Sequence, residues 1–278
     1  MLRPVLAATI LTGLIGVVVA VAARLKSILP PNRAQPGRRR SPSFSPSSNV
    51  KAHPSRRLER ASLDDALFDS PTYLYQHFMV VLGSGGHTAE MLLMLRTVAL
   101  SKWRKRSWVV SSGDEFSASL ATEFEAELQC PGSCSFDIVK LPRARKVHQS
   151  IFTTPFTSLV CLWTSLSMLS RDAPDIILTN GPGTGVIVVF ASILLRFFGV
   201  DGSHRTRCVY VESLARCKTL SLSGRLLKMF VDRFLVQWPE LGGGRAEFKG
   251  CLALDAAIAI GMNGIGDTEF VPLMEFLF

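Results

Sequence analysis

The chain has 278 residues, of which 47% are hydrophobic and 19% are charged. This composition supports a sizeable core and excludes a protein that is disordered throughout. Much of the net charge of +9 follows the first apolar segment, which favours anionic lipid headgroups as the partner. The sequence has neither zinc-finger spacing nor an aromatic–basic RNA signature, so we expect no nucleic-acid partner.

The N-terminal segment contains 19 consecutive uncharged residues, from Val5 to Ala23. With a rise of about 1.5 Å per residue, such a helix just crosses a hydrocarbon core of about 30 Å. We therefore predict a transmembrane anchor over residues 1–26, and the basic residues that follow it place the rest of the chain in the cytosol. The competing interpretation is a secretory signal peptide, because Ala20-Val21-Ala22 resembles a cleavage site.

The next segment, residues 27–70, is rich in proline, serine and arginine and has no hydrophobic period. Between residues 24 and 60, ten lysines and arginines stand against one acid, Glu59. We predict a disordered basic linker that stays close to a membrane surface.

Short apolar runs alternate with helical patterns from residue 71 onward. Strands are predicted over residues 77–82, 107–111, 136–140, 175–179, 208–211 and 233–237. Helices are predicted from the glycines after residue 82 to about residue 100, and over residues 115–128, 186–198 and 220–231. This alternation predicts an α/β fold, a single Rossmann-like doubly wound parallel sheet over residues 71–241.

Two apolar segments of this region have a second interpretation. Residues 151–169 and 186–198 are each interrupted by polar residues or a charge, so neither is a clean membrane span. Buried core helices and helices that lie on a membrane surface remain equally open for both.

The six cysteines form no paired framework, since the close pair Cys130 and Cys134 has no second pair to complete a metal site. We expect reduced thiols, no metal and no cofactor.

Two glycine-rich loops follow predicted strands at the edge where such sheets bind ligands. The first loop comprises Gly83, Ser84, Gly85, Gly86, His87 and Thr88. The second loop contains Asn180, Gly181, Gly183 and Thr184. Glycines before a helix expose backbone amides to a phosphate, so the two loops predict a site for a ligand that carries a diphosphate.

Three further features surround this predicted site. His87 is suited to take a proton from a sugar hydroxyl, with helix capping as the alternative role. Glu212, at the end of the fifth strand, is suited to bind a sugar hydroxyl or Arg216. A basic loop follows the third strand and contributes either phosphate contacts or solvated charge; it comprises Arg143, Arg145, Lys146 and His148.

Three motifs in this order resemble the asparagine-linked glycosylation protein fourteen family. They are VVLGSGGHTAEM (Val80–Met91), ILTNGPGTG (Ile177–Gly185), and YVESLARCKTLSLSGRLL with DRFLVQWPEL (Tyr210–Leu227, Asp232–Leu241). The resemblance implies one half of a two-Rossmann (GT-B) glycosyltransferase. Such a subunit is anchored at the cytosolic face of the endoplasmic reticulum by a single transmembrane pass.

The resemblance also implies partners and a reaction. The family recruits a donor-binding catalytic subunit, asparagine-linked glycosylation protein thirteen, which binds UDP-N-acetylglucosamine (UDP-GlcNAc), and presents the acceptor N-acetylglucosaminyl-diphosphodolichol (GlcNAc-PP-dolichol). Together they add the second N-acetylglucosamine of the N-glycan precursor, so this chain is expected to be a non-autonomous subunit. The bacterial transferase MurG has a similar glycine loop and histidine, which implies that His87 is the base.

One segment departs from the family. After Leu241 the family continues into a short tail that docks on the catalytic partner, whereas here Gly242-Gly243-Gly244 opens a different sequence. We therefore treat residues 242–278 as an atypical C-terminal tail.

Two other functional classes remain open. One is a non-catalytic membrane adaptor. The other is a membrane-bound nucleotide-dependent oxidoreductase, although the first loop lacks the full dinucleotide fingerprint.

Overall fold

The computed structural model describes residues 2–30, 77–98, 100, 103–128, 134–145, 154–181, 183–200 and 206–261. The predicted linker thus lies almost entirely outside the described residues, as do Lys146 and His148 of the predicted basic loop.

The centre of the fold is a seven-stranded parallel sheet in the order β3-β2-β1-β4-β5-β6-β7. Its strands are β1 (His77–Val81), β2 (Lys105–Ser111), β3 (Ser135–Leu141), β4 (Ile176–Thr179), β5 (Arg207–Val211), β6 (Arg233–Val236) and β7 (Ala246–Phe248). The first six strands have the Rossmann order, and the strand order reverses between β1 and β4. The predicted doubly wound sheet is confirmed.

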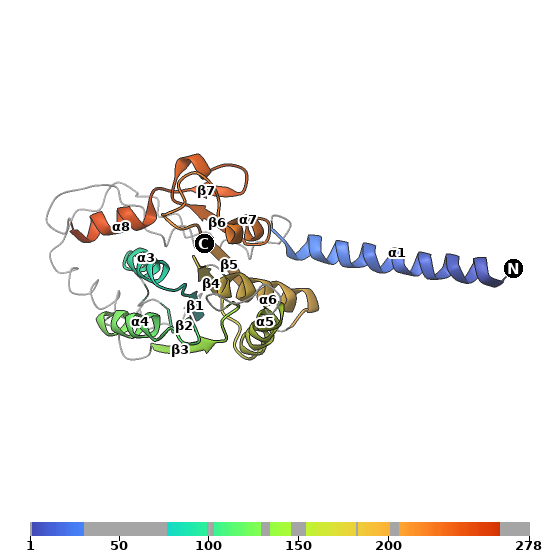
Figure 1. Cartoon of the computed structure of the whole chain (residues 1–278), viewed down its shortest axis with the longest axis horizontal. Helices are drawn as coiled ribbons and strands as arrows, with labels where there is room; N and C mark the ends of the chain where they lie inside the picture. The colour runs from blue at the N-terminus through green and yellow to red at the C-terminus, as the bar shows by residue number, and fades with distance from the viewer. Residues whose placement is uncertain are drawn as a thin grey trace, which may run out of the picture. The chain divides into compact units, whose positions relative to one another are not determined.

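Helices cover both faces of this sheet (Figure 1). They are α3 (Gly86–Leu95), α4 (Glu115–Glu127), α5 (Thr154–Arg171), α6 (Thr184–Phe198), α7 (Leu222–Leu227) and α8 (Leu252–Gly261). A short 3₁₀ turn, η2 (Pro239–Leu241), links β6 to β7. The helix predicted to reach about residue 100 ends at Leu95, and the one predicted over residues 220–231 is shorter.

Each face of the sheet packs into its own hydrophobic cluster, because successive side chains along a strand point to opposite faces. Phe78 and Val80 of β1 pack with α3, α4 and α8. Met79 and Val81, their neighbours in the same strand, pack with α5, α6 and α7. Every residue of β1 is buried, as expected for a central parallel strand.

Two elements lie beyond the predicted domain boundary at residue 241. Strand β7 pairs with β6 in parallel, and α8 packs against α3 with Leu252, Ala253 and Ala256 buried. The sheet therefore continues into the sequence that departs from the family motifs.

The N-terminal helix α1 (Leu2–Ile28) is apolar along most of its length. Within the described residues, no helix meets the combined length and hydropathy needed to cross a bilayer. The end of α1 contacts α6, where the Arg24 guanidinium donates to the carbonyl oxygens of Phe197 (3.0 Å) and Arg196 (3.2 Å).

Candidate functional site

The two predicted glycine loops meet at the point where the strand order reverses. The first follows β1 and the second follows β4, and these strands are neighbours in the sheet. A Cβ built on Gly181 would lie 2.8 Å from the Cα of Gly83 and 3.0 Å from its nitrogen. The two backbones are therefore in direct contact, at the crevice where open α/β sheets bind their ligands.

The first loop is shaped by glycine at two positions. A Cβ on Gly83 would lie 2.6 Å from the Cβ of His87, so a side chain has no room there. Gly85 has φ of 60° at the N-cap of α3, a left-handed backbone that favours glycine. Ser84, Gly85 and Gly86 are exposed at the start of α3, where the first amides of a helix lack helical partners. This end of α3 can therefore bind an anion.

Thr88 has a different place from the one predicted. It is fully buried, and its hydroxyl bonds the carbonyl of Gly83 and the hydroxyl of Ser117, the latter at 2.7 Å. Ser117 is itself held by Asp114, whose carboxylate accepts from the Ser117 hydroxyl at 2.9 Å. Thr88 thus fixes the loop from beneath and does not face the crevice.

The second loop is tied to the first. The side-chain amide of Asn180 donates to the carbonyl oxygen of His87 (2.8 Å), and its own Oδ1 is buried without a hydrogen-bond partner. Gly183, with φ of 71°, is the N-cap of α6. The hydroxyl of Thr184 lies 3.0 Å from that of Ser111 at the end of β2. The ends of β1, β2 and β4 are therefore joined around one crevice.

His87 lies in the first turn of α3 with its side chain 32% exposed. Its Nδ1 is buried, without a hydrogen-bond partner, and 3.9 Å from Oε2 of Glu90. The Glu90 carboxylate therefore lies on the side of the ring that carries the buried Nδ1, while the side chain as a whole remains partly open to solvent.

Glu90 and Gln237 are site residues that sequence reasoning missed. The Glu90 carboxylate accepts from the Ser213 hydroxyl (2.9 Å), from the Leu214 amide (2.6 Å) and from the side chain of Gln237. The Gln237 amide also donates to the carbonyl oxygen of Glu212 (3.0 Å) and accepts from the Ala253 amide (3.0 Å). These bonds connect α3, the ends of β5 and β6, and the start of α8. The position of Glu90 three residues after His87, on the same helix face, was the signal available.

Glu212 was predicted to bind a sugar hydroxyl or Arg216. Its side chain is 1% exposed, and Oε2 accepts from both the amide and the hydroxyl of Ser221 at 3.1 Å. A Cβ on Gly224 would lie 2.1 Å from the same oxygen. In the described structure the carboxylate therefore fixes the start of α7 and does not reach the glycine loops. Burial, and then this carboxylate, raise the pKa of Tyr210.

The basic loop after β3 lies at the same edge of the sheet. Arg143 donates from Nε to the carbonyl oxygen of Ser112, which follows β2, at 3.0 Å. Among the described residues, no group of three or more His, Cys, Asp or Glu side chains is arranged to hold a metal ion.

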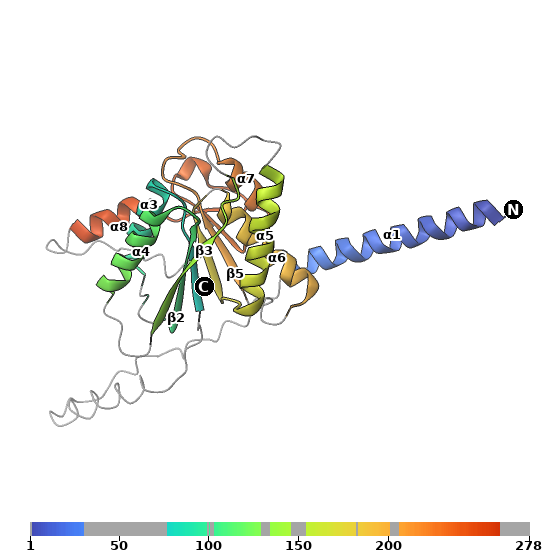
Figure 2. The ribbon, with the colours of Figure 1, turned by 60° about the horizontal axis from the view of Figure 1, so that its bottom comes forward.

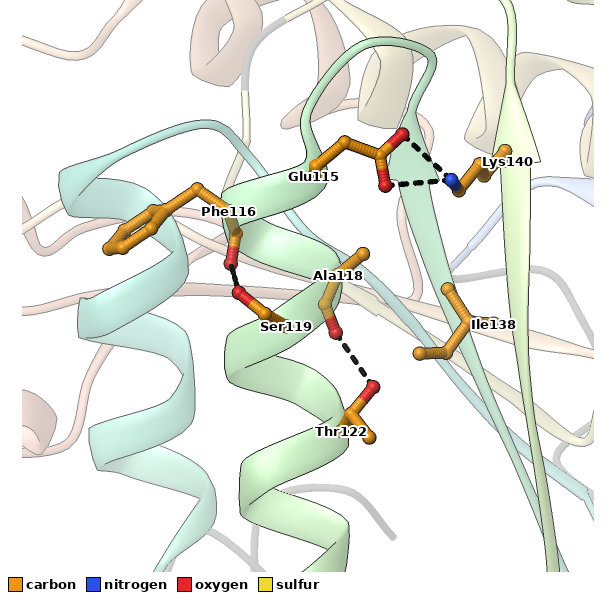
Figure 3. Close-up of a pocket in the computed structure, with 7 residues that line it drawn as sticks. All are labelled: Glu115, Phe116, Ala118, Ser119, Thr122, Ile138 and Lys140. Carbon is orange, nitrogen blue, oxygen red and sulfur yellow. Dashed lines mark hydrogen bonds and ion pairs between the residues drawn. The ribbon is translucent and has the colours of Figure 1, made fainter.

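A separate open hollow of about 610 Å³ lies between α4 and the edge strand β3 (Figure 3). It is lined by Glu115, Phe116, Ala118, Ser119, Thr122, Ile138 and Lys140. Lys140 donates to both oxygens of Glu115 (2.7 and 2.8 Å), and the two hydroxyls donate to carbonyls of their own helix. The lining includes no residue of the glycine loops, and its polar groups satisfy one another, so the crevice remains the candidate site.

Comparison with known proteins identifies the family of this chain. The family profile described as "Oligosaccharide biosynthesis protein Alg14 like" matches residues 78–252, more than half of the chain and the whole sheet. The chain belongs to this family. The match runs past residue 241 and thus includes β7, the strand that the motifs did not reveal.

Curated relatives of this Alg14-like chain carry one name. The chain is 45% identical over 183 residues to the UDP-N-acetylglucosamine transferase subunit alg14 of Schizosaccharomyces pombe, covering 64% of this chain and 84% of the relative. It is 40% identical over 167 residues to the human subunit of that name, covering 59% and 76%. The crystal structure of Acinetobacter baumannii MurG has a TM-score of 0.46 at 13% identity, over 63% of this chain and 45% of MurG.

Proposed function

We propose that this chain is the membrane-anchoring, acceptor-presenting subunit of the UDP-GlcNAc:GlcNAc-PP-dolichol N-acetylglucosaminyltransferase. In this role it acts at the cytosolic face of the endoplasmic reticulum, in the second step of N-glycan precursor synthesis. The observation that carries the proposal is the direct contact of the two glycine loops at the crevice of the sheet. The names of the relatives, at 40–45% identity, support the same assignment.

The acceptor's diphosphate is the part that the crevice suits best. Its negative charge would lie against the amides at the start of α3, where the helix dipole favours an anion. Glycines at 83 and 181 let the ligand approach the backbone closely. The first sugar would then extend toward His87, which is partly exposed at the same helix start.

His87 would act as the base. As the acceptor hydroxyl oxygen bonds to the anomeric carbon of N-acetylglucosamine, its proton passes to Nε2 and UDP leaves with the electron pair. The Glu90 carboxylate, 3.9 Å from Nδ1, stabilises the resulting imidazolium. Three donors hold Glu90 in place, so it is a positioning residue for His87.

The donor sugar nucleotide would be bound by a second subunit, asparagine-linked glycosylation protein thirteen, which this chain recruits to the membrane. The apolar segment within α1 and the basic residues after it support anchoring with the sheet domain in the cytosol.

Reconstitution tests the assignment. Co-expression with the donor-binding subunit should yield the disaccharide lipid from UDP-GlcNAc and GlcNAc-PP-dolichol, whereas this chain alone should not. His87→Ala should slow the reaction by about 10² to 10⁴-fold while the two subunits still co-purify. Ser119→Ala, on the surface of α4, is the matched control and should keep full activity. Full activity of His87→Ala would remove the base role and leave a binding scaffold, and turnover by this chain alone would refute the two-subunit assignment.

A further inference from the structure

One face of the domain carries an apolar helix surface that no other described element covers. Of α5, only a narrow stripe is buried, made by Cys161, Ser165 and Leu169. On its outer side, apolar residues recur at the spacing of one helix face and are exposed to solvent. This α5 stripe comprises Phe156, Leu159, Val160 and Trp163. Phe156 is 72% and Trp163 75% exposed, which is unusual for two neighbouring large aromatic residues on one helix.

The apolar surface is repeated on the neighbouring helices of the same face. Helix α6 packs directly on α5, and it exposes Phe198 at its end. Leu222 and Leu226 of α7 are exposed, together with Met229 just after it. Figure 2 shows α5 and α6 on one side of the sheet, away from α3 and α4. These exposed apolar residues thus share one layer of the fold, whereas the opposite layer exposes fewer of them, Phe116 of α4 and Leu254 of α8.

The charges of the two helical layers differ in sign. Helices α5, α6 and α7 contain no aspartate or glutamate, and they carry the exposed bases Arg171 and Arg225. Helix α4, in the opposite layer, contains no lysine or arginine and four glutamates: Glu115, Glu123, Glu125 and Glu127. Helices that contain no acidic residue and expose apolar and basic side chains are suited to a surface of anionic lipid.

We propose that the α5–α6–α7 layer lies on the membrane surface, with the α5 stripe inserted at the level of the headgroups and Arg171 and Arg225 beside them. Aromatic side chains, tryptophan above all, are favoured at this depth. The inference rests on the proposed action at a membrane, and it adds a second contact that is independent of α1. On this proposal the described part of residues 151–169, which belongs to α5, is a surface helix.

This contact would bear on how the acceptor is reached. Helix α6 begins at Thr184 in the second glycine loop, and its other end carries the exposed Phe198. A membrane in contact with the α5–α6–α7 layer would therefore lie beside helices that start at the crevice. A diphosphate linked to a lipid could then bind at the loops while its hydrocarbon chain stays in the bilayer.

Tryptophan quenching tests the contact in the full chain. The protein has four tryptophans. Trp103 and Trp108 are buried and Trp238 is half-buried, so Trp163 is the strongly exposed one. The chain would be reconstituted in vesicles of phosphatidylcholine and phosphatidylserine with brominated acyl chains. We expect loss of most of the Trp163 emission, taken as the difference between the wild type and Trp163→Phe.

A matched probe on the opposite layer is the control. Phe116 of α4 is 63% exposed, so Phe116→Trp in the Trp163→Phe background places a largely exposed indole there, and its emission should be unchanged by the brominated lipid. Equal quenching of both probes, or quenching of neither, would overturn the proposal. The proposal would also be overturned if the donor-binding subunit, without any lipid, shielded Trp163 from aqueous acrylamide. The α5 stripe would then be a protein interface. Transfer to a water-soluble acceptor analogue would persist in each case, which separates this test from that of the proposed function.

Discussion

Gly181→Ala isolates the contact on which the site depends. Its backbone lies outside the left-handed region, so alanine is disfavoured there by space alone. The added methyl would lie 2.8 Å from the Cα of Gly83 and 3.0 Å from its nitrogen. Both atoms belong to the backbone, so no side-chain rotation can relieve the overlap, and the two loops must separate.

The loss of stability in Gly181→Ala can be estimated from overpacking substitutions in the cores of other proteins. One methyl forced against a rigid neighbour destabilises a protein by about 1–3 kcal/mol. For a domain of this size, about 1 kcal/mol corresponds to about 2–4 °C in Tm, so we expect a fall of about 2–12 °C. Separation of the loops should also weaken the acceptor site, with a higher KM for the lipid acceptor.

Thermal unfolding of the purified chain, with Gly86→Ala as the control, measures this effect. A Cβ on Gly86 would meet nothing within 4 Å, and alanine is the better helix former, so the control should be as stable as the wild type or more so. If Gly181→Ala unfolds at the temperature of the control and keeps its acceptor KM, the loops are not held by backbone contact and the account of the site fails.

Two further predictions concern stability. Glu125→Ala should cost about 3–5 kcal/mol in chemical denaturation because it removes the carboxylate that faces the buried Arg106 guanidinium. Lys140→Ala, which breaks an exposed pair, should cost less than about 1 kcal/mol, and equal costs would contradict the assigned burial. Stability should also fall as pH drops below about 6.5, because burial lowers the pKa of His77 and the unfolded chain therefore takes up the proton first. The pKa of Asp172 is also lowered: burial raises it, but Lys105 and His77 lower it by more. Protonation of Asp172 therefore adds a further loss of stability at lower pH. A profile of unfolding free energy against pH checks this, and His77→Gln should flatten it between pH 5 and 7; an unchanged slope would refute the assignment.

The sheet was predictable because its signals are local. Each of the six predicted strands is a short, mostly apolar run followed by turn residues, and each is present in the structure at nearly the predicted bounds. All but the edge strand β3 are largely buried. Strand β7 was missed because Ala246–Phe248 has three residues and no alternating pattern of its own. Its pairing with β6, which lies close in sequence and in space, determines its conformation.

The site was predictable in position but not in the direction of its side chains. A residue at the end of a parallel strand must lie at the ligand-binding edge, and this rule located His87, Asn180 and Glu212. It could not show that Ser221 would fold back over the Glu212 carboxylate and turn it away from the crevice. Nor could it show that Glu90, inside a helix, bonds to the loop after β5. Both outcomes depend on contacts between elements that are distant in sequence.

The need for glycine at both loops follows from the topology. Neighbouring parallel strands lie about 4.8 Å apart, and β1 and β4 are neighbours although almost a hundred residues separate them in the chain. Their connections leave in opposite directions, to α3 on one face and α6 on the other, so the two loops diverge only after touching at Gly83 and Gly181. Side chains at that contact would push the loops apart and fill the crevice. The same reversal of strand order that builds the sheet therefore places bare backbone, two helix N-termini and the His87 ring around one space.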